Sequence, residues 1–105
     1  MQRGEVYRFK IPKGVGQVQQ GERYGVVVQS DVMLPRSVVI VAPTSRCAKP
    51  ASFRPEVEVA GDVTRVLVEQ LGAVDVQRLG RRVGRLTAEE MWSIDEALVI
   101  VLGLD

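Results

Sequence analysis

The chain has 105 residues, of which 46% are hydrophobic and 26% are charged, and its formal net charge is +1. This length fits one domain with a small core, so we expect a single domain over residues 1–105. The sequence has no histidine and one cysteine, Cys47. These counts exclude a Ser-His-Asp triad, a Cys-His dyad, an internal disulfide and a structural zinc site. No apolar run is long enough to span a membrane and no signal-peptide pattern is present, so we expect a cytoplasmic protein with no membrane contact.

The charges are distributed unevenly along the chain. Residues 1–54 hold nine Lys and Arg against three acids, giving +6, whereas residues 55–105 hold five Arg against ten acids, giving −5. A near-neutral protein can therefore carry a basic face of the kind that a polyanion binds. An ordinary mixed surface is the alternative interpretation.

Twenty valines and only five aromatic residues predict a high content of β-sheet. Some segments alternate between apolar and polar residues, as half-exposed strands do, and others are continuous apolar runs typical of buried strands. Ser30 can cap a short helical turn that stops at Pro35. Strands are predicted at residues 5–11, 24–29, 38–42, 55–59, 64–68 and 81–86, with a second helical turn at residues 76–79.

Two irregular segments interrupt this pattern. Residues 12–22 are rich in glycine and glutamine and lack periodicity, which predicts a long loop. Residues 43–55 are basic and lack acids. Loops of this kind often carry binding residues.

The C-terminal segment is predicted to be a helix. Thr87 and Glu90 have the spacing of a capping box, and Gly103 is expected to end the helix. Apolar residues then recur at helical spacing, at Met91, Ile94, Leu98, Val101 and Leu102. We therefore expect a mainly β fold, a small curved antiparallel barrel with one C-terminal helix packed against it.

Polar residues at two strand ends suggest a site for a phosphodiester. Arg23 directly precedes one buried strand, and Thr44 and Ser45 follow another, so adjacent antiparallel strands can bring them together. A guanidinium binds phosphate oxygens, and a hydroxyl can complete the charge-stabilising site. RNA supplies its own nucleophile, the 2′-OH, so such a site requires neither histidine nor metal. The alternatives are a solvated arginine and ordinary turn residues.

Other residues could contact a nucleic acid. Gln17, Gln19 and Gln20 could bind the base edges of single-stranded RNA, or could simply be polar loop residues. Trp92 lies in the predicted helix and is expected to pack rather than to stack on bases. A cluster of arginines near the last predicted strand could hold phosphates or could be the solvated face of that strand, and the second interpretation is favoured; the cluster is Arg78, Arg81, Arg82 and Arg85.

These motifs together resemble the MazF/PemK family of toxin endoribonucleases over nearly the full chain. The chain starts Arg3-Gly4-Glu5-Val6-Tyr7, which is similar to the start of family members. Each motif alone is weak, but six in order at suitable spacing are specific. The further similar segments are Gly21–Val28 with Gln29-Ser30-Asp31, Ala42–Ser45, Leu67–Leu71, Asp75 with Arg78-Leu79, and Ile94–Leu98 with Leu102–Leu104.

The resemblance implies a dimeric SH3-like barrel that cleaves single-stranded RNA at a short sequence without a metal or other cofactor. It implies that Arg23 and Thr44 are the catalytic pair and that the products carry 2′,3′-cyclic phosphate and 5′-OH ends. Gln19 and Gln70 match family glutamines near the substrate. Together with Gln17, Ser45 and Arg46, they form the expected substrate-binding set. The implied partner is an antitoxin whose disordered C-terminal segment occupies the RNA groove.

The chain departs from the family at two positions. Tyr24 replaces the usual proline after the catalytic arginine, and Gly72 stands where many members have an arginine. The alternatives are a CcdB-like toxin that binds DNA gyrase without cleaving RNA, and an inactive homologue that only sequesters antitoxin. The gyrase alternative is disfavoured because CcdB-type proteins end Trp-Gly-Ile, whereas this chain ends Leu-Gly-Leu-Asp.

Overall fold

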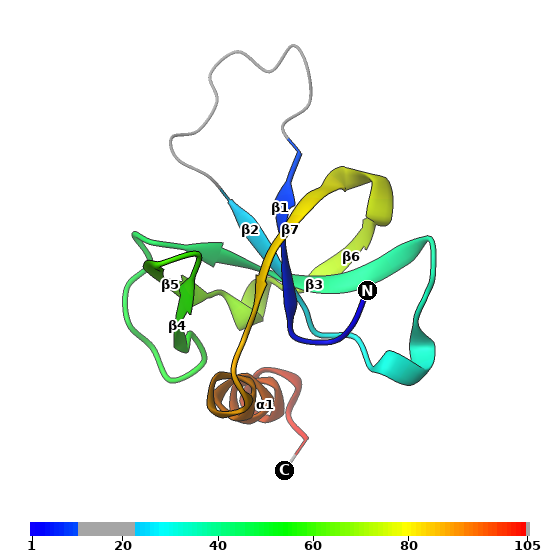
Figure 1. Ribbon diagram of the computed structural model, residues 1–105. Helices are drawn as coiled ribbons and strands as arrows, with labels where there is room; N and C mark the ends of the chain where they lie inside the picture. Colours follow the sequence, from blue (N-terminus) through cyan, green and yellow to red (C-terminus); the bar gives the residue numbers. More distant parts are fainter. Residues whose placement is uncertain (11–22, 105) are drawn as a thin grey trace.

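The computed structural model describes residues 1–10 and 23–104. They form a curled antiparallel sheet with one C-terminal helix (Figure 1). Hydrogen-bonded neighbours follow the order β4-β5-β3-β2-β1-β7, and β6 pairs with β3. The strands are β1 (Glu5–Phe9), β2 (Tyr24–Val27), β3 (Val38–Ser45), β4 (Glu56–Val59), β5 (Asp62–Val66), β6 (Gly72–Asp75) and β7 (Leu79–Arg85); the helix is α1 (Ala88–Leu102), and short 3-10 turns are η1 (Asp31–Met33), η2 (Val68–Gln70) and η3 (Val76–Arg78).

β3 is the organising strand because it changes partner along its length. Residues 38–41 pair with β6, residues 41–43 pair with β2, and Thr44 and Ser45 pair with β5. A single strand can serve three partners only in a sheet that curls, and Figure 1 shows β3 crossing beneath β1 and β2 toward β5. The curl brings the ends of β2, β3 and β5 to one region of the molecule.

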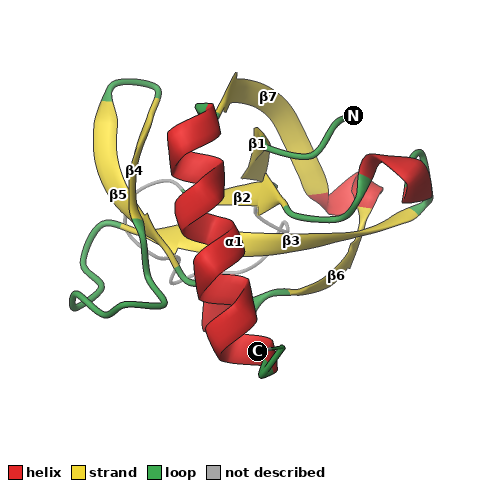
Figure 2. Cartoon of the chain, turned by 90° about the horizontal axis from the view of Figure 1, so that it is seen from below, coloured by secondary structure: helices red, strands yellow, loops and turns green. Residues whose placement is uncertain are grey.

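The helix covers one face of this half-barrel (Figure 2). The Thr87 hydroxyl accepts the Glu90 N–H and the Glu90 carboxylate accepts the Thr87 N–H, which is the predicted capping box. Gly103 ends the helix with a φ of 67°, in the left-handed region that glycine adopts at low cost. Ile94 and Ala97 are fully buried against the sheet. Removing an isoleucine side chain of this kind from water stabilises a fold by about 1.5–3 kcal/mol.

The two faces of the sheet bury separate sets of apolar side chains. Val26 and Ala42 belong to the main core beneath α1, whereas Val27 and Val41 belong to a second cluster that includes Tyr7 and Phe9 at its edge. Neighbouring residues of β2 and β3 therefore alternate between two apolar environments. This burial on both faces explains why these strands are continuous apolar runs in the sequence.

The structure corrects several predicted boundaries. Thr44 and Ser45 are the last residues of β3 rather than the start of an irregular segment. The strand predicted at residues 64–68 instead runs from Asp62 to Val66, and Val68 begins η2. β6 was not predicted, because its four residues show neither a long apolar run nor a strong turn signal. The predicted loop at residues 12–22 lies outside the described residues.

Trp92 is a further correction, since it was expected to pack in the core. Its exposed fraction is 69%, and it lies on the outer surface of α1 near Glu89 and Glu96. The helix packs against the core through Met91, Ile94 and Leu98 instead. Trp92 follows Met91 in the sequence, but successive residues of a helix point in different directions. Helical spacing therefore places Trp92 outside the buried face.

Candidate active site

Arg23 and Thr44 lie at the same end of two neighbouring strands. The register of β2 and β3 pairs Gly25 with Pro43 and Val26 with Ala42. Continuing this register places Tyr24 opposite Thr44 and Arg23 opposite Ser45. The strand ends therefore meet as the sequence predicted, although the catalytic roles of the two residues stay a prediction.

The Arg23 side chain is exposed and available to a ligand. Its backbone carbonyl accepts a hydrogen bond of 3.0 Å from the Phe9 N–H, which fixes the main chain beside β1. Within residues 1–10 and 23–104 its guanidinium makes no hydrogen bond or ion pair. An arginine held by its backbone alone keeps all its guanidinium donors for an anion.

Thr44 is in a different environment, because its exposed fraction is only 2%. It pairs with Val66 of β5 on one side and lies next to Pro43, whose carbonyl accepts the Leu67 N–H at 2.8 Å. The residue is thus fixed by neighbours on both sides. Because the backbone is fixed here, the Thr44 side chain loses less conformational freedom when its hydroxyl donates a hydrogen bond.

Ser45 and Arg46 lie beyond Thr44, where β3 ends. Ser45 pairs with Arg65 of β5, and its hydroxyl accepts the Cys47 N–H at 3.3 Å. That contact is the turn chemistry that the sequence left open as an alternative. Arg46 is exposed and makes no hydrogen bond or ion pair with the residues that the structure describes.

Gln70 is exposed at the end of η2, which packs against β3. The preceding residue, Glu69, accepts hydrogen bonds of 2.6 and 2.9 Å from the Arg54 guanidinium. These bonds hold the pKa of the Glu69 carboxyl below its ordinary value of 4.5. Arg54 also donates to the Lys49 carbonyl at 3.2 Å. The ion pair therefore ties the basic segment after β3 to the turn that carries Gln70.

Gln17 and Gln19 lie outside the described residues. The structure therefore shows the positions of only four of the six residues that were predicted to form the site together with Arg23. The structure brings Thr44, Ser45 and Arg46 together on consecutive positions of β3 and its turn. It places Gln70 on the η2 turn that follows β5. The Arg54–Glu69 pair was missed from the sequence, since no local pattern links two residues fifteen positions apart.

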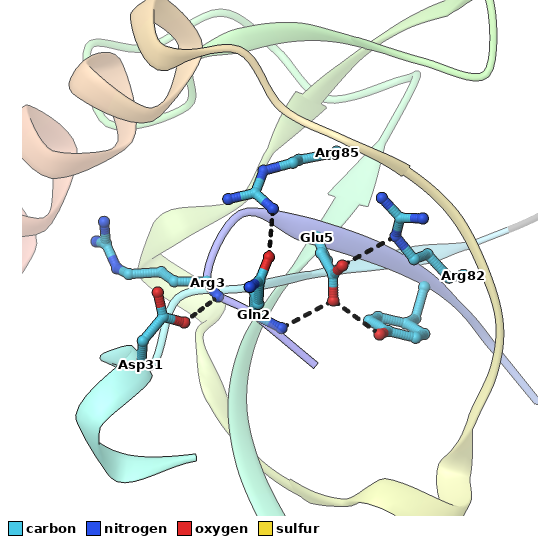
Figure 3. Close-up of polar contacts among 7 residues, drawn as sticks. Gln2, Arg3, Glu5, Asp31, Arg82 and Arg85 are labelled. Carbon is cyan, nitrogen blue, oxygen red and sulfur yellow. Dashed lines mark hydrogen bonds and ion pairs between the residues drawn. The ribbon is translucent and has the colours of Figure 1, made fainter. Parts of the chain in front are cut away.

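A second polar cluster surrounds Glu5 at the start of β1 (Figure 3). The Glu5 carboxylate accepts the Gln2 N–H at 2.8 Å, the Tyr7 hydroxyl at 2.9 Å and the Arg82 guanidinium at 3.0 Å. Burial raises the pKa of Glu5, but these hydrogen bonds and the charge of Arg82 outweigh it, so the pKa lies below 4.5. Both carboxylate oxygens of Glu5 therefore accept at least one donor, as expected of a structural network. Arg85, which donates to Gln2, extends it.

Among residues 1–10 and 23–104, no three side chains of the types that bind metals lie together. The same residues contain no helix with the length and apolarity needed to cross a membrane.

The fold and the strand-end residues together define a class of protein. It is a curled antiparallel half-barrel with a C-terminal helix, in which an exposed arginine and a buried threonine end neighbouring strands. The family model described as PemK-like, MazF-like toxin of type II toxin-antitoxin system matches residues 2–102, and the chain belongs to this family.

Individual relatives agree with this assignment. Rv3098A of Mycobacterium tuberculosis is 42% identical over 104 residues, which cover 97% of each chain. Endoribonuclease MazF9 of the same organism is 32% identical over 117 residues, covering 99% of this chain and 98% of the relative. A solved structure of an endoribonuclease in complex with its cognate antitoxin, from a mycobacterial species, has a TM-score of 0.81. It covers 100% of this chain and 97% of the other at 19% identity, and so supports the fold.

Proposed function

We propose that the chain, as a MazF-like toxin endoribonuclease of a toxin–antitoxin system, cleaves single-stranded RNA by attack of the RNA's own 2′-OH, without a metal. The observation that carries the proposal is the position of Arg23, which is exposed directly before β2, on a strand end that neighbours the end of β3 where Thr44 and Ser45 lie. The relationship to proteins named endoribonucleases supports the reaction class.

The reaction is an internal phosphoryl transfer. The 2′-oxygen forms a bond to phosphorus, the bond from phosphorus to the 5′-oxygen breaks, and the products are a 2′,3′-cyclic phosphate and a 5′-OH. The proton lost by the 2′-OH is balanced by the proton gained by the 5′-oxygen, so no water is consumed. Arg23 stabilises the charge on the pentacoordinate phosphate and assists proton transfer to the leaving oxygen. Thr44 donates a hydrogen bond to a phosphate oxygen or orients the attack.

The substrate-binding residues that we propose surround this pair. Ser45 and Arg46 continue from Thr44 at the end of β3, and Gln70 projects from η2, the turn tied to Pro43. An exposed glutamine offers both a donor and acceptor to an unstacked base. Gln17 and Gln19 complete the proposed set from outside the described residues.

We further propose a single toxin domain over residues 1–105 that acts in the cytoplasm as a homodimer. Its partner is a cognate antitoxin whose disordered C-terminal segment occupies the RNA groove and folds on binding. A mycobacterial structure of the same fold contains an endoribonuclease with its cognate antitoxin, which supports such a pairing.

The test is incubation of the purified protein with a long single-stranded RNA in EDTA, followed by mapping of the cut sites and their end groups. We expect cuts at one short motif with cyclic phosphate and 5′-OH ends. A matched RNA with a 2′-deoxy nucleotide before the scissile bond should resist cleavage. Cutting of that RNA would show that water attacks instead. No cutting of either RNA would favour the gyrase-binding or antitoxin-sequestering alternative.

A further inference from the structure

A cavity of about 480 Å³ lies between β7 and the turn that joins β4 to β5. Its walls include the side chains of Arg8, Tyr24, Arg81 and Arg82 on one side and Asp62 on the other. Three arginines against one aspartate make the lining basic. Figure 1 shows the position of β7 beside β1, with the β4–β5 hairpin opposite.

The strand register explains how these side chains meet. Arg8 of β1 pairs with Tyr24 of β2, so both lie on the same face of the sheet. On its other edge β1 pairs with β7, where Tyr7 faces Arg82 but Phe9 faces Leu79. Between these two pairs, β1 has one residue, Arg8, and β7 has two, Gly80 and Arg81. The extra residue is a β-bulge, a feature that re-aims side chains next to functional sites.

The bulge places Gly80 and Arg81 together opposite Arg8. A Cβ on Gly80 would lie 3.4 Å from the Arg8 backbone oxygen and 3.5 Å from the Arg8 Cβ, which is ordinary van der Waals contact. β7 therefore packs directly against Arg8 at this position. As a result Tyr24, Arg8 and Arg81 form a row across three adjacent strands.

Two arginines that line the cavity differ in how they are engaged. Arg82 is held by Glu5 through a 3.0 Å ion pair and belongs to the cluster of Figure 3. Arg81 is exposed, and within the described ranges it makes no hydrogen bond or ion pair. An arginine aimed by a bulge into a basic cavity, with its donors uncommitted, fits a phosphate group.

The row also leads to the candidate active site. Tyr24 directly follows Arg23 in the chain, and the continued register places it opposite Thr44. Neighbouring strands are about 4.8 Å apart, so Arg8 lies roughly 10 Å and Arg81 roughly 14 Å from Thr44 across the sheet. A phosphate bound in the cavity and the scissile phosphate are thus within reach of one short RNA strand.

We propose that the cavity is a second RNA-binding subsite, in which Arg81 binds a phosphate of the strand flanking the cleavage site. The proposal rests on the proposed function, since it assigns this cavity to the same RNA substrate. Its consequence is that RNA extending beyond the cleavage motif on one side gains affinity from residues that take no part in the cleavage step.

The test compares a minimal RNA that holds only the cleavage motif with RNAs extended on the 5′ or the 3′ side. All are made uncleavable by one 2′-deoxy nucleotide, so that Kd is measured by fluorescence anisotropy independently of catalysis. For the unmodified protein we expect a lower Kd for one of the extended RNAs. Arg81→Ala should lose most of that gain, several-fold in Kd, and bind the minimal RNA as before.

Two controls make the result specific. Arg36→Ala removes another exposed arginine, whose Nε donates only to the Met33 carbonyl at 3.3 Å in η1, and should leave every Kd unchanged. Arg81→Lys should keep part of the gain, because it retains the charge without the planar fork. The dependence of log Kd on log salt for the favoured RNA should decrease by about 0.7 in Arg81→Ala, the value for one phosphate on a single strand.

The outcomes separate this inference from the proposed function. If Arg81→Ala binds the extended RNAs as the unmodified protein does, or if Arg36→Ala loses as much, the subsite is wrong even where cleavage is normal. If Arg81→Ala weakens only binding of an acidic antitoxin peptide, the cavity binds protein and the RNA proposal is also overturned. If cleavable RNAs are not cut but the extended RNA still binds through Arg81, the subsite stands and the proposed reaction fails.

Discussion

The arginines of this protein form two groups that differ in what their guanidinium groups contact. Arg3 binds Asp95 and the Val28 carbonyl, and Arg54 binds Glu69. By contrast, Arg23 and Arg81 are exposed and, in the part of the chain that the structure describes, make no such contact. Paired arginines stabilise local structure, whereas uncommitted arginines keep their donors for a polyanion.

The largest effect is expected for the uncommitted arginine of the candidate active site. Arg23→Ala should lower the cleavage rate by roughly 10²–10³-fold, as removal of one charge-stabilising donor does elsewhere. Its thermal midpoint should stay unchanged, because the guanidinium is exposed and makes no hydrogen bond or ion pair with the described residues. Rates from RNA cleavage and melting curves from circular dichroism check both parts. Full activity in a folded Arg23→Ala protein would remove Arg23 from the mechanism.

The opposite pattern is expected for the Glu5 cluster. Glu5→Ala should destabilise the protein by about 2–3 kcal/mol, because the Tyr7 hydroxyl and the Gln2 N–H lose their acceptor and Arg82 loses its counter-charge. Urea unfolding measures the change. Glu58→Ala, which removes an exposed carboxylate, serves as the matched control and should change stability by less than about 0.5 kcal/mol. Equal effects in the two variants would contradict a structural role for the cluster.

The Arg54–Glu69 pair should give a pH-dependent effect. The pKa of Glu69 is lowered in the folded state, so its stabilising contribution is present above the ordinary carboxyl value of 4.5 and is lost as pH falls through the lower folded value. The stability difference between the unmodified protein and Glu69→Gln should therefore be constant near pH 7 and shrink below about pH 4.5. Urea unfolding across this range tests the sign. A difference that grows on acidification would exclude the pair as its source.

The smallest effect is expected for Trp92, which lies on the acidic outer surface of α1. Because 69% of the residue is exposed, Trp92→Ser should change the free energy of unfolding by no more than about 0.5 kcal/mol. Ile94→Ala, two positions away and fully buried, should cost about 2–5 kcal/mol and provides the contrast. A large loss in Trp92→Ser would restore the packing role that the sequence suggested.

The sequence predicts best where local rules dominate. The capping box at Thr87 and Glu90 and the stop at Gly103 are local, and the structure confirms both. The proximity of the strand ends that carry Arg23 and Thr44 could be predicted because it requires only that two buried strands be neighbours. The curl of the sheet also follows the family resemblance, which the comparisons confirm.

What could not be predicted depends on contacts between distant positions. β6 is recognised only by its pairing with β3, since Gly72–Asp75 has little strand character of its own. The bulge that places Arg81 opposite Arg8 arises from a shift of register between β1 and β7. Such a shift depends on how the two strands pair and cannot be predicted from either sequence segment alone. The near-complete burial of Thr44 likewise depends on a distant strand, because Thr44 pairs with Val66 of β5.

The partner change along β3 also limits which genetic changes the protein can tolerate. Ala42 and Thr44 lie on one face of this strand, and Pro43 and Ser45 lie on the other. Loss or gain of one codon between Val38 and Thr44 would turn every following side chain to the opposite face. A neighbouring residue would then take the position of Thr44 at the strand end. The pairing of β3 with β6, β2 and β5 could no longer keep its register along the whole strand. Substitutions can adjust this strand one residue at a time, but its length is fixed by three partners at once.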